Sequence, residues 1–421
     1  MHLTTAITLC LVALAMPNRA NAQASDSADD YGLNAIDVST HARGIVPLPE
    51  SVDRTLRRHF ARYTRVVAPN GKPIHILAQA AWSEDQIMHA RKVLEHLLTD
   101  VPGTRFGADK SSVANAMAER RATLVLFEDE RMMEKAFRGR LGELHLGMQD
   151  LRANECPAVG SEDYLAHKTR DASYEEILHL VHDYGIRPAL KEYDGLIQQA
   201  SDRATEMGRW QPWPEDEPDS FRNEYIAAAY DNYLDLWTVP PTHYEGQKLE
   251  AEDLPKGTSH FGSFGAGSRA ALKVDDKKGY QLMLDFFPQA LTYTAELPVD
   301  FTGMFCIDLQ KDLRYTTKAQ HLRNVTLRGS KDAGLKGNAS ANNLTGNNGA
   351  NILHGGGGDD FLRGGAGEDT AVFQGPASEY TIDALKDGVR VTDTTPGRDG
   401  VDWLWEIEQF QFRDGRQESP Q

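Results

Sequence analysis

In the first half of the chain, apolar residues alternate between short continuous runs and runs with helical spacing. The segments Pro73–Ala78 and Ala122–Phe127 are short and largely apolar, which is typical of buried strands. Between them, Ser83 and Gln86 have the spacing of a capping box, and the apolar residues that follow recur at helical intervals. Another helix is expected over 111–121. The apolar face of the first helix consists of Ile87, Ala90, Leu94, Leu97 and Leu98.

The segment from Ser173 to Tyr184 also has helical spacing. Ser173 and Glu176 are placed as a second capping box, and Gly185 stands where such a helix would end. Because strands and helices follow one another in this way, the pattern predicts a mixed α/β domain over residues 51–240.

The end of this domain contains one more expected helix. A proline-rich loop at Pro212–Pro218 precedes it, and Asp219 or Ser220 would cap it. The helix would run to Trp237, because the pair of prolines beginning at Pro240 cannot continue it.

Beyond this helix the composition changes. Residues 241–268 are rich in Gly, Ser and Pro, which predicts a linker. Residues 269–335 are expected to form a β-rich segment, with strand-like composition at Tyr280–Phe287, Leu291–Leu297 and Met304–Leu309. The overall expectation is a mixed α/β (α+β) N-terminal domain, then this β-rich segment, then the repeats described next.

Residues 336–371 repeat with a period of nine. Each unit has Gly in second place, Gly or Asn in third, Gly or Ser in fifth and Asp or Asn in seventh. The ninth residue is apolar, so it can point inward and stack on its counterparts in neighbouring coils. The units are KGNASANNL, TGNNGANIL, HGGGGDDFL and RGGAGEDTA.

This pattern resembles the RTX, or haemolysin-type, calcium-binding repeats. The resemblance implies a right-handed parallel β-roll with two nonapeptides in each coil. Asn342 would then face Asp360, and Asn351 would face Asp369, as calcium ligands. Because each pair offers one carboxylate and one amide, we expect weak sites, in the range of about 10⁻⁴–10⁻³ M typical of extracellular modules. The segment 372–421 resembles the cap that follows such repeats.

The N-terminus has the features of a secretory leader. An apolar run from Leu3 to Met16 is too short to span a bilayer, and Ala20-Asn21-Ala22 offers a small-x-small cleavage site. A signal peptide over 1–22 and a flexible lead-in over 23–50 are expected, although no Lys or Arg precedes the apolar run. The mature protein should be secreted, without stable insertion in a membrane.

The net charge of the chain and its few cysteines bear on which partners it can bind and on whether it has a disulfide. The formal net charge of −17 disfavours binding to nucleic acid. After removal of the leader, which contains Cys10, the chain keeps Cys156 and Cys306. These two residues form either one disulfide in an oxidising compartment or two separate buried thiols, and the sequence leaves both alternatives open.

The segment Glu175-Glu176-Ile177-Leu178-His179 resembles a degenerate form of the His-Glu-x-x-His motif of zincin metallopeptidases, with Glu175 in place of the first histidine. The resemblance implies Glu175 and His179 as zinc ligands, because helical spacing places them on one face, and Glu176 as the catalytic base. Glu224 would be the third ligand, from a later helix. The metzincin extension fails, because His182 and Gly185 stand in exchanged places. A polypeptide would be the substrate.

Other interpretations of this segment remain open. Glu176 and His179 also have the spacing found in di-iron carboxylate bundles, although no second such motif is evident. Glu176 is also explained as the capping-box residue, and Glu175 as a favourable charge in the first turn of a helix. On that basis the protein would be a non-catalytic extracellular calcium-binding adhesion or matrix protein.

Overall fold

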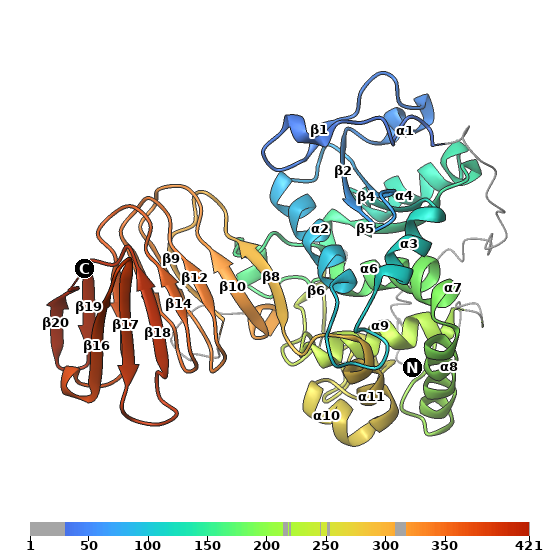
Figure 1. Ribbon diagram of the computed structural model, residues 1–421. Helices are drawn as coiled ribbons and strands as arrows, with labels where there is room; N and C mark the ends of the chain where they lie inside the picture. The colour runs from blue at the N-terminus through green and yellow to red at the C-terminus, as the bar shows by residue number, and fades with distance from the viewer. Residues whose placement is uncertain are drawn as a thin grey trace, which may run out of the picture.

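The computed structural model describes residues 30–213, 218, 220–244, 246–250, 253–307 and 317–420. The expected signal peptide, the first residues of the lead-in and Asp219 lie outside the described residues. Figure 1 shows a helix-rich α/β part formed by the N-terminal two thirds and an elongated β part formed by the C-terminal third of the chain. None of the helices in the described parts of the chain combines the length and apolar character that crossing a bilayer requires.

The N-terminal part is built on a five-stranded sheet in the order β1-β2-β3-β4-β5. Strands β3, β4 and β5 are parallel, whereas β1 and β2 are joined antiparallel at the other edge. Both strands expected from the apolar runs are present with the expected bounds. The strands are β1 (Val46–Pro47), β2 (Arg62–Val67), β3 (Pro73–Ala78), β4 (Ala122–Phe127) and β5 (Gly147–Arg152).

Helices cover this sheet and extend below it in Figure 1. The first follows the expected capping box, in which the Ser83 side chain and the Gln86 side chain each accept the other residue's backbone N–H. The helices are α1 (Arg54–His59), α2 (Glu84–Leu98), α3 (Ser111–Glu119), α4 (Glu130–Phe137), α5 (Glu162–Leu165), α6 (Ser173–Val181), α7 (Arg187–Ala189), α8 (Lys191–Glu206), α9 (Phe221–Tyr233), α10 (Arg269–Asp275) and α11 (Lys277–Phe286).

The two ends expected for α6 are wrong. Ser173 does not cap the helix, because its hydroxyl donates to Asp171 Oδ1 over 2.6 Å and α6 has no side-chain cap. Gly185 does not end it either, since the chain continues through a π-helical turn, His182–Ile186, into α7. A Cβ at Gly185 would lie only 2.6 Å from Val113 Cγ1, so the glycine is needed for close packing against α3.

The segments 241–268 and Tyr280–Phe287 also differ from expectation. The first does not behave as an open linker, because Phe264 is fully buried, with its ring centroid 5.8 Å from that of Trp210. The second forms most of α11, because Leu282, Met283 and Phe286 have helical spacing and bury one face, and Asp276 caps its start. Two short strands, β6 (His243–Tyr244) and β7 (Gln247–Lys248), form a hairpin here.

The C-terminal part is a parallel roll of two sheets whose strands alternate along the chain. Strands two repeats apart pair in parallel, so Leu344 pairs with Leu362 and Leu335 with Leu353. The ninth-place residues are no more than 1% exposed, which makes them the core of the roll. The first sheet runs β16 (Tyr380–Leu385), β17 (Gly388–Asp393), β18 (Val401–Trp405), β14 (Phe361–Arg363), β12 (Asn343–Thr345), β10 (Leu322–Thr326) and β8 (Leu291–Glu296).

The second sheet faces the first across the leucine core and extends beyond the repeats in both directions. It runs β20 (Gly415–Glu418), β19 (Gln409–Phe412), β15 (Thr370–Val372), β13 (Asn351–His354), β11 (Ala333–Lys336) and β9 (Gly303–Cys306). The strands expected around Leu291 and Met304 are therefore coils of the roll itself.

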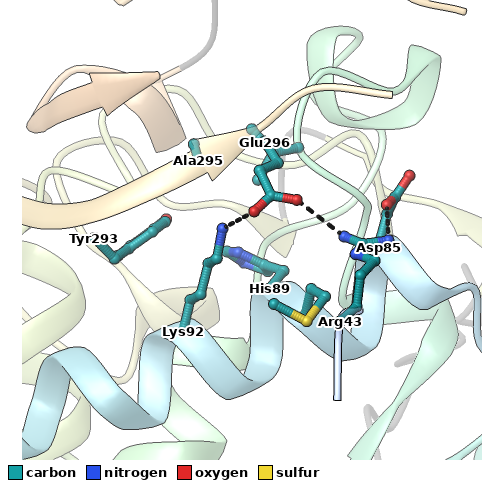
Figure 2. Close-up of a pocket in the computed structure, with 9 residues that line it drawn as sticks. Arg43, Asp85, His89, Lys92, Tyr293, Ala295 and Glu296 are labelled. Atoms are coloured by element: carbon teal, nitrogen blue, oxygen red, sulfur yellow. Dashed lines mark hydrogen bonds and ion pairs between the residues drawn. The ribbon is translucent and has the colours of Figure 1, made fainter. Parts of the chain in front are cut away.

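The roll is joined to the N-terminal part where β8 lies beside α2 (Figure 2). Lys92 Nζ donates to Thr294 O over 2.8 Å, and the Glu296 carboxylate forms ion pairs with both Lys92 and Arg43. Arg328, on the roll side, pairs with Asp85 at the start of α2. The same junction contains a small pocket lined by Arg43, Asp85, Met88, His89, Lys92, Val159, Tyr293, Ala295 and Glu296.

The two cysteines of the described chain are not bridged. Cys156 and Cys306 are both buried and no disulfide joins them, so the structure has the second of the two alternatives. Burial raises the pKa of the Cys156 thiol, which keeps it protonated at neutral pH.

Candidate metal sites

The seventh-place residues of the repeats face one another as expected. The Asn342 backbone N–H donates to Asp360 Oδ1 over 2.8 Å, and the Asn351 N–H donates to Asp369 Oδ1 over 2.7 Å. Both asparagine side chains also brace their own loops, since Asn342 Oδ1 accepts from Asn338 N and Asn351 Oδ1 from Asn347 N. The asparagines therefore hold the coil together through hydrogen bonds that need no ion.

The two aspartates are left electrostatically unsatisfied. Asp360 and Asp369 are both fully buried, and Oδ2 of each has no hydrogen-bond partner in the described chain. Burial raises the pKa of Asp360 to about 7 and that of Asp369 to about 6. A hard divalent cation would compensate these carboxylates, which is the chemistry that calcium supplies.

These pKa shifts predict how pH acts on the calcium-free roll. A carboxyl group whose folded pKa lies above its unfolded value binds extra protons in the fold, so folding is favoured at low pH and weakened as pH rises from about 4 to 7. We expect the urea midpoint of the calcium-free roll, followed by tryptophan fluorescence, to fall over that window. Saturating calcium should remove the fall, and Asp360→Asn should make it smaller. A calcium-free midpoint that rises with pH would contradict this account.

In the N-terminal part, the three expected zinc ligands lie together. Glu175 and His179 are one turn apart on α6, and Glu224 comes from α9, which packs against it. His179 Nε2 lies 3.5 Å from Glu224 Oε2 and 3.9 Å from Glu175 Oε1. One ligand atom from each of the three residues lies within 4.8 Å of the other two. Despite burial, the carboxylates of Glu224 and Glu176 raise the pKa of His179.

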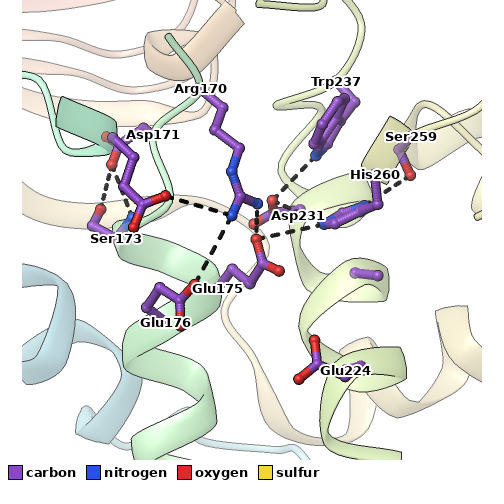
Figure 3. Close-up of polar contacts among 12 residues, drawn as sticks. Arg170, Asp171, Ser173, Glu175, Glu176, Glu224, Asp231, Trp237, Ser259 and His260 are labelled. Atoms are coloured by element: carbon purple, nitrogen blue, oxygen red, sulfur yellow. Dashed lines mark hydrogen bonds and ion pairs between the residues drawn. The ribbon is translucent and has the colours of Figure 1, made fainter. Parts of the chain in front are cut away.

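A buried arginine, which the sequence did not point to, lies against Glu175 on the side away from Glu224 (Figure 3). Arg170 Nη1 forms a close ion pair with Glu175 Oε2, and Nη2 lies 3.9 Å from Glu176 Oε1 and 4.0 Å from Glu155 Oε2. The Arg170 side chain is only 7% exposed. The guanidinium therefore already supplies a positive charge on one side of Glu175.

Glu176, the expected base, contacts both Arg170 at the cluster and the edge strand of the sheet. Its Oε2 accepts a hydrogen bond of 2.8 Å from the Gln149 side chain on β5. Burial raises the pKa of Glu176, and His179 and Arg170 oppose that rise. The residue is thus not a helix cap, and its carboxylate is held in one position beside the edge strand of the sheet.

A second group of ligand atoms shares Glu175. His260 Nε2 lies 3.8 Å from Glu175 Oε2 and 3.4 Å from Asp231 Oδ2, and it makes no hydrogen bond within the described residues. Trp237 Nε1 donates to Asp231 Oδ2, as Figure 3 shows. Asp231 could have been found from the sequence, because it lies two helical turns after Glu224 and so shares a helix face with it. No sequence pattern indicates that His260 belongs to this site, because it lies in the segment expected to be a linker.

A third group lies nearer the junction with the roll. His89 Nε2 is 2.8 Å from Asp171 Oδ2, and Ser173 donates to the other Asp171 oxygen. Cys156 completes a possible ligand set with these residues. Because the aspartate is already hydrogen-bonded on both oxygens and the thiol is protonated, this group is a buried structural network in the described state.

The parallel roll, its leucine core and its facing Asp and Asn side chains define a calcium-binding β-roll. In agreement, a family described as the RTX calcium-binding nonapeptide repeat matches residues 336–371 in four copies. The chain therefore carries RTX repeats, which bind calcium and are typical of secreted proteins.

The other comparisons add little. Among solved structures the chain is similar to the extracellular lipase LipA from Serratia marcescens, at 13% identity and a TM-score of 0.19. The similarity covers 31% of this chain and 20% of the lipase, so this chain matches a fifth of that protein and the likeness carries no inference about activity. No curated protein matches. Neither the family match nor the lipase supports the zincin hypothesis.

Proposed function

We propose that this chain is a secreted calcium-binding RTX protein whose N-terminal part binds zinc and hydrolyses polypeptides. The observation that carries the catalytic half is the convergence of Glu175, His179 and Glu224 from two packed helices. One imidazole and two carboxylates supply three ligands, the number that a catalytic zinc site takes from the protein while it keeps a further position for water. Secretion through the leader at 1–22 is part of the same proposal.

In this proposal zinc, when bound, would lower the pKa of a water molecule and polarise the scissile carbonyl. Glu176 accepts the proton from that water. Its raised pKa suits it to proton transfer near neutral pH, and Gln149 fixes one of its oxygens. Arg170 must shift toward Glu155 to leave Glu175 available as a ligand.

The neighbouring strand supports a polypeptide as the substrate. Strand β5 is the last strand of its sheet, and Gln149, which contacts the proposed base, lies on it. An extended peptide can add to such an edge through main-chain hydrogen bonds. A substrate bound in this way would lie beside Glu176.

The test is metal content together with proteolysis. The purified mature protein should contain one zinc ion per chain by elemental analysis and should cleave an unfolded protein substrate. Glu224→Gln and His179→Ala should each lose both the zinc and the cleavage while keeping calcium binding. Glu206→Gln, an exposed carboxylate on α8, is the control and should behave as wild type. A wild-type protein without zinc and without cleavage would exclude this function.

A second function is favoured by one observation, the close pairing of Arg170 with Glu175. If the guanidinium permanently replaces a metal ion there, the N-terminal part is a recognition module of a non-catalytic adhesion or matrix protein. Such a protein would bind calcium normally, contain no zinc after purification from zinc-supplemented medium, and show no proteolysis.

A further inference from the structure

The cap contains a segment with the same internal pattern as the repeats. In residues 396–404, glycines occupy the second and fifth places, an aspartate the seventh and a leucine the ninth, as in the unit at 354–362. The hairpin of β16 and β17 separates this segment from the last repeat and breaks the period of nine. The four places are filled by Gly397, Gly400, Asp402 and Leu404.

The strand of this segment continues the roll in register. Leu404 on β18 pairs in parallel with Leu362, as Leu362 pairs with Leu344 one coil earlier. All three leucines are 1% exposed or less. The segment therefore occupies the coil position that a further repeat would fill.

The loop of the segment also stacks as a repeat loop does. Gly400 has a φ of +81°, and a Cβ placed on it would lie 2.0 Å from Gly358 O, the fifth-place residue one coil earlier. Gly358, with a φ of +102°, also lies close to the fifth-place residue of the coil before it, where a Cβ would be 2.8 Å from Ser340 C. Only glycine fits such a close approach between successive loops.

Seventh-place side chains form a continuous ladder through this segment. The Asn342 N–H donates to Asp360 Oδ1 over 2.8 Å, and the Asp360 N–H donates to Asp402 Oδ1 over 3.0 Å. Asp360 is fully buried and Asp402 is 3% exposed. The free oxygen of Asp360, Oδ2, is without a hydrogen bond in the part of the chain that the structure describes. The pair Asp360 and Asp402 thus offers two carboxylates, whereas the pair Asn342 and Asp360, one coil earlier, offers one.

We propose that residues 396–404 are a fifth nonapeptide and that its loop and the loop at 354–360 bind a calcium ion through Asp360 and Asp402. Two buried carboxylates and the surrounding loop carbonyls suit a hard cation, and a higher ligand charge strengthens calcium binding. This site is therefore tighter than a site that pairs one carboxylate with one amide, and it fastens the cap to the repeats. The proposal is independent of the zinc site.

Asp402→Asn in the full mature protein is the sharpest test, because asparagine keeps the oxygen that accepts from Asp360 N. An asparagine is already present in the seventh place at Asn342, where its Oδ1 accepts from Asn338 N. In calorimetric calcium titrations the variant should bind one ion fewer in the tightest class of sites. Asp387→Asn, at the exposed tip of the cap hairpin, is the control and should titrate as wild type. An Asp402→Asn protein with an unchanged number of ions and unchanged affinities would overturn the proposal.

A second measurement covers the case in which Asp402→Asn fails to fold. Terbium replaces calcium and emits when a nearby tryptophan is excited, and Trp403 is next to Asp402 on β18. Trp403→Phe should remove much of the emission of the first terbium ion bound, because the excited tryptophan is lost. The substitution should keep the fold, because an aromatic ring still stacks on Phe361. Trp213→Phe, in the N-terminal part, should leave that emission unchanged. Equal emission from the two variants would show that the first ion binds elsewhere.

Discussion

Arg170→Met is expected to destabilise the N-terminal part by about 3–5 kcal/mol at neutral pH, because it removes one partner of a buried ion pair. Arg170 is in contact with Glu175 and lies within 4.0 Å of Glu155 and Glu176, and its side chain is 7% exposed. Without the guanidinium, three carboxylates face one another away from water. Urea unfolding followed by far-ultraviolet circular dichroism measures the change.

The pH and metal dependence of this variant separate the two candidate functions. Unpaired buried carboxylates take up protons, so the loss of stability should shrink as pH is lowered toward about 4–5. If the cluster binds zinc, added zinc should restore much of the lost stability, since the ion replaces the missing positive charge. Arg203→Met, whose side chain is 56% exposed, is the control and should change stability by about 0–1 kcal/mol. Equal midpoints for the two variants would contradict the central role of Arg170.

Leu362→Ala is expected to destabilise the calcium-loaded roll by about 2–5 kcal/mol, the range for a leucine deleted from a packed core. Leu362 is fully buried and pairs with Leu344 on one side and Leu404 on the other, so the cavity would interrupt three successive coils. Unfolding by urea, followed through the fluorescence of Trp403 and Trp405, reports on the same coils.

The matched control for this substitution is Leu385→Ala on the cap hairpin. Leu385 is 43% exposed, so its truncation should change stability by less than about 0.5 kcal/mol. If Leu362→Ala were as stable as this control, the ninth-place leucines would not be the core that holds the roll together.

The features predicted correctly are those that neighbouring residues determine. The turn, the ligand and the inward side chain of a nonapeptide all lie within nine positions, and the resemblance to RTX repeats implies two nonapeptides in each coil. The facing of Asn342 with Asp360 follows from these two points together. The same holds for the capping box at Ser83 and for the apolar strands of the first sheet. The convergence of Glu175, His179 and Glu224 was predicted because the first two lie one helical turn apart and Glu224 is carried on a similarly regular helix, while zinc binding by them stays a proposal.

The features missed depend on contacts between distant parts of the chain. Arg170 and His260 reach Glu175 from irregular segments, and nothing near them in the sequence indicates that destination. The sequence suggests that Gly185 ends a helix, since glycine is common at such ends. Its actual role is close packing against Val113, which is distant in the sequence. The α11 segment has composition typical of a strand, but its apolar residues have helical spacing, and that spacing decides its structure.

The two ends of the roll differ from its middle, and this limits how the protein can associate. At one end β8 is held by α2 and by Lys92, and at the other the antiparallel strands β16, β17 and β20 replace the parallel coils. A parallel coil presented by a second molecule would meet α2 beside β8 at one end and a reversed strand at the other, which disfavours the addition of further coils. Calcium can therefore order the repeats in each molecule without promoting end-to-end growth into fibres.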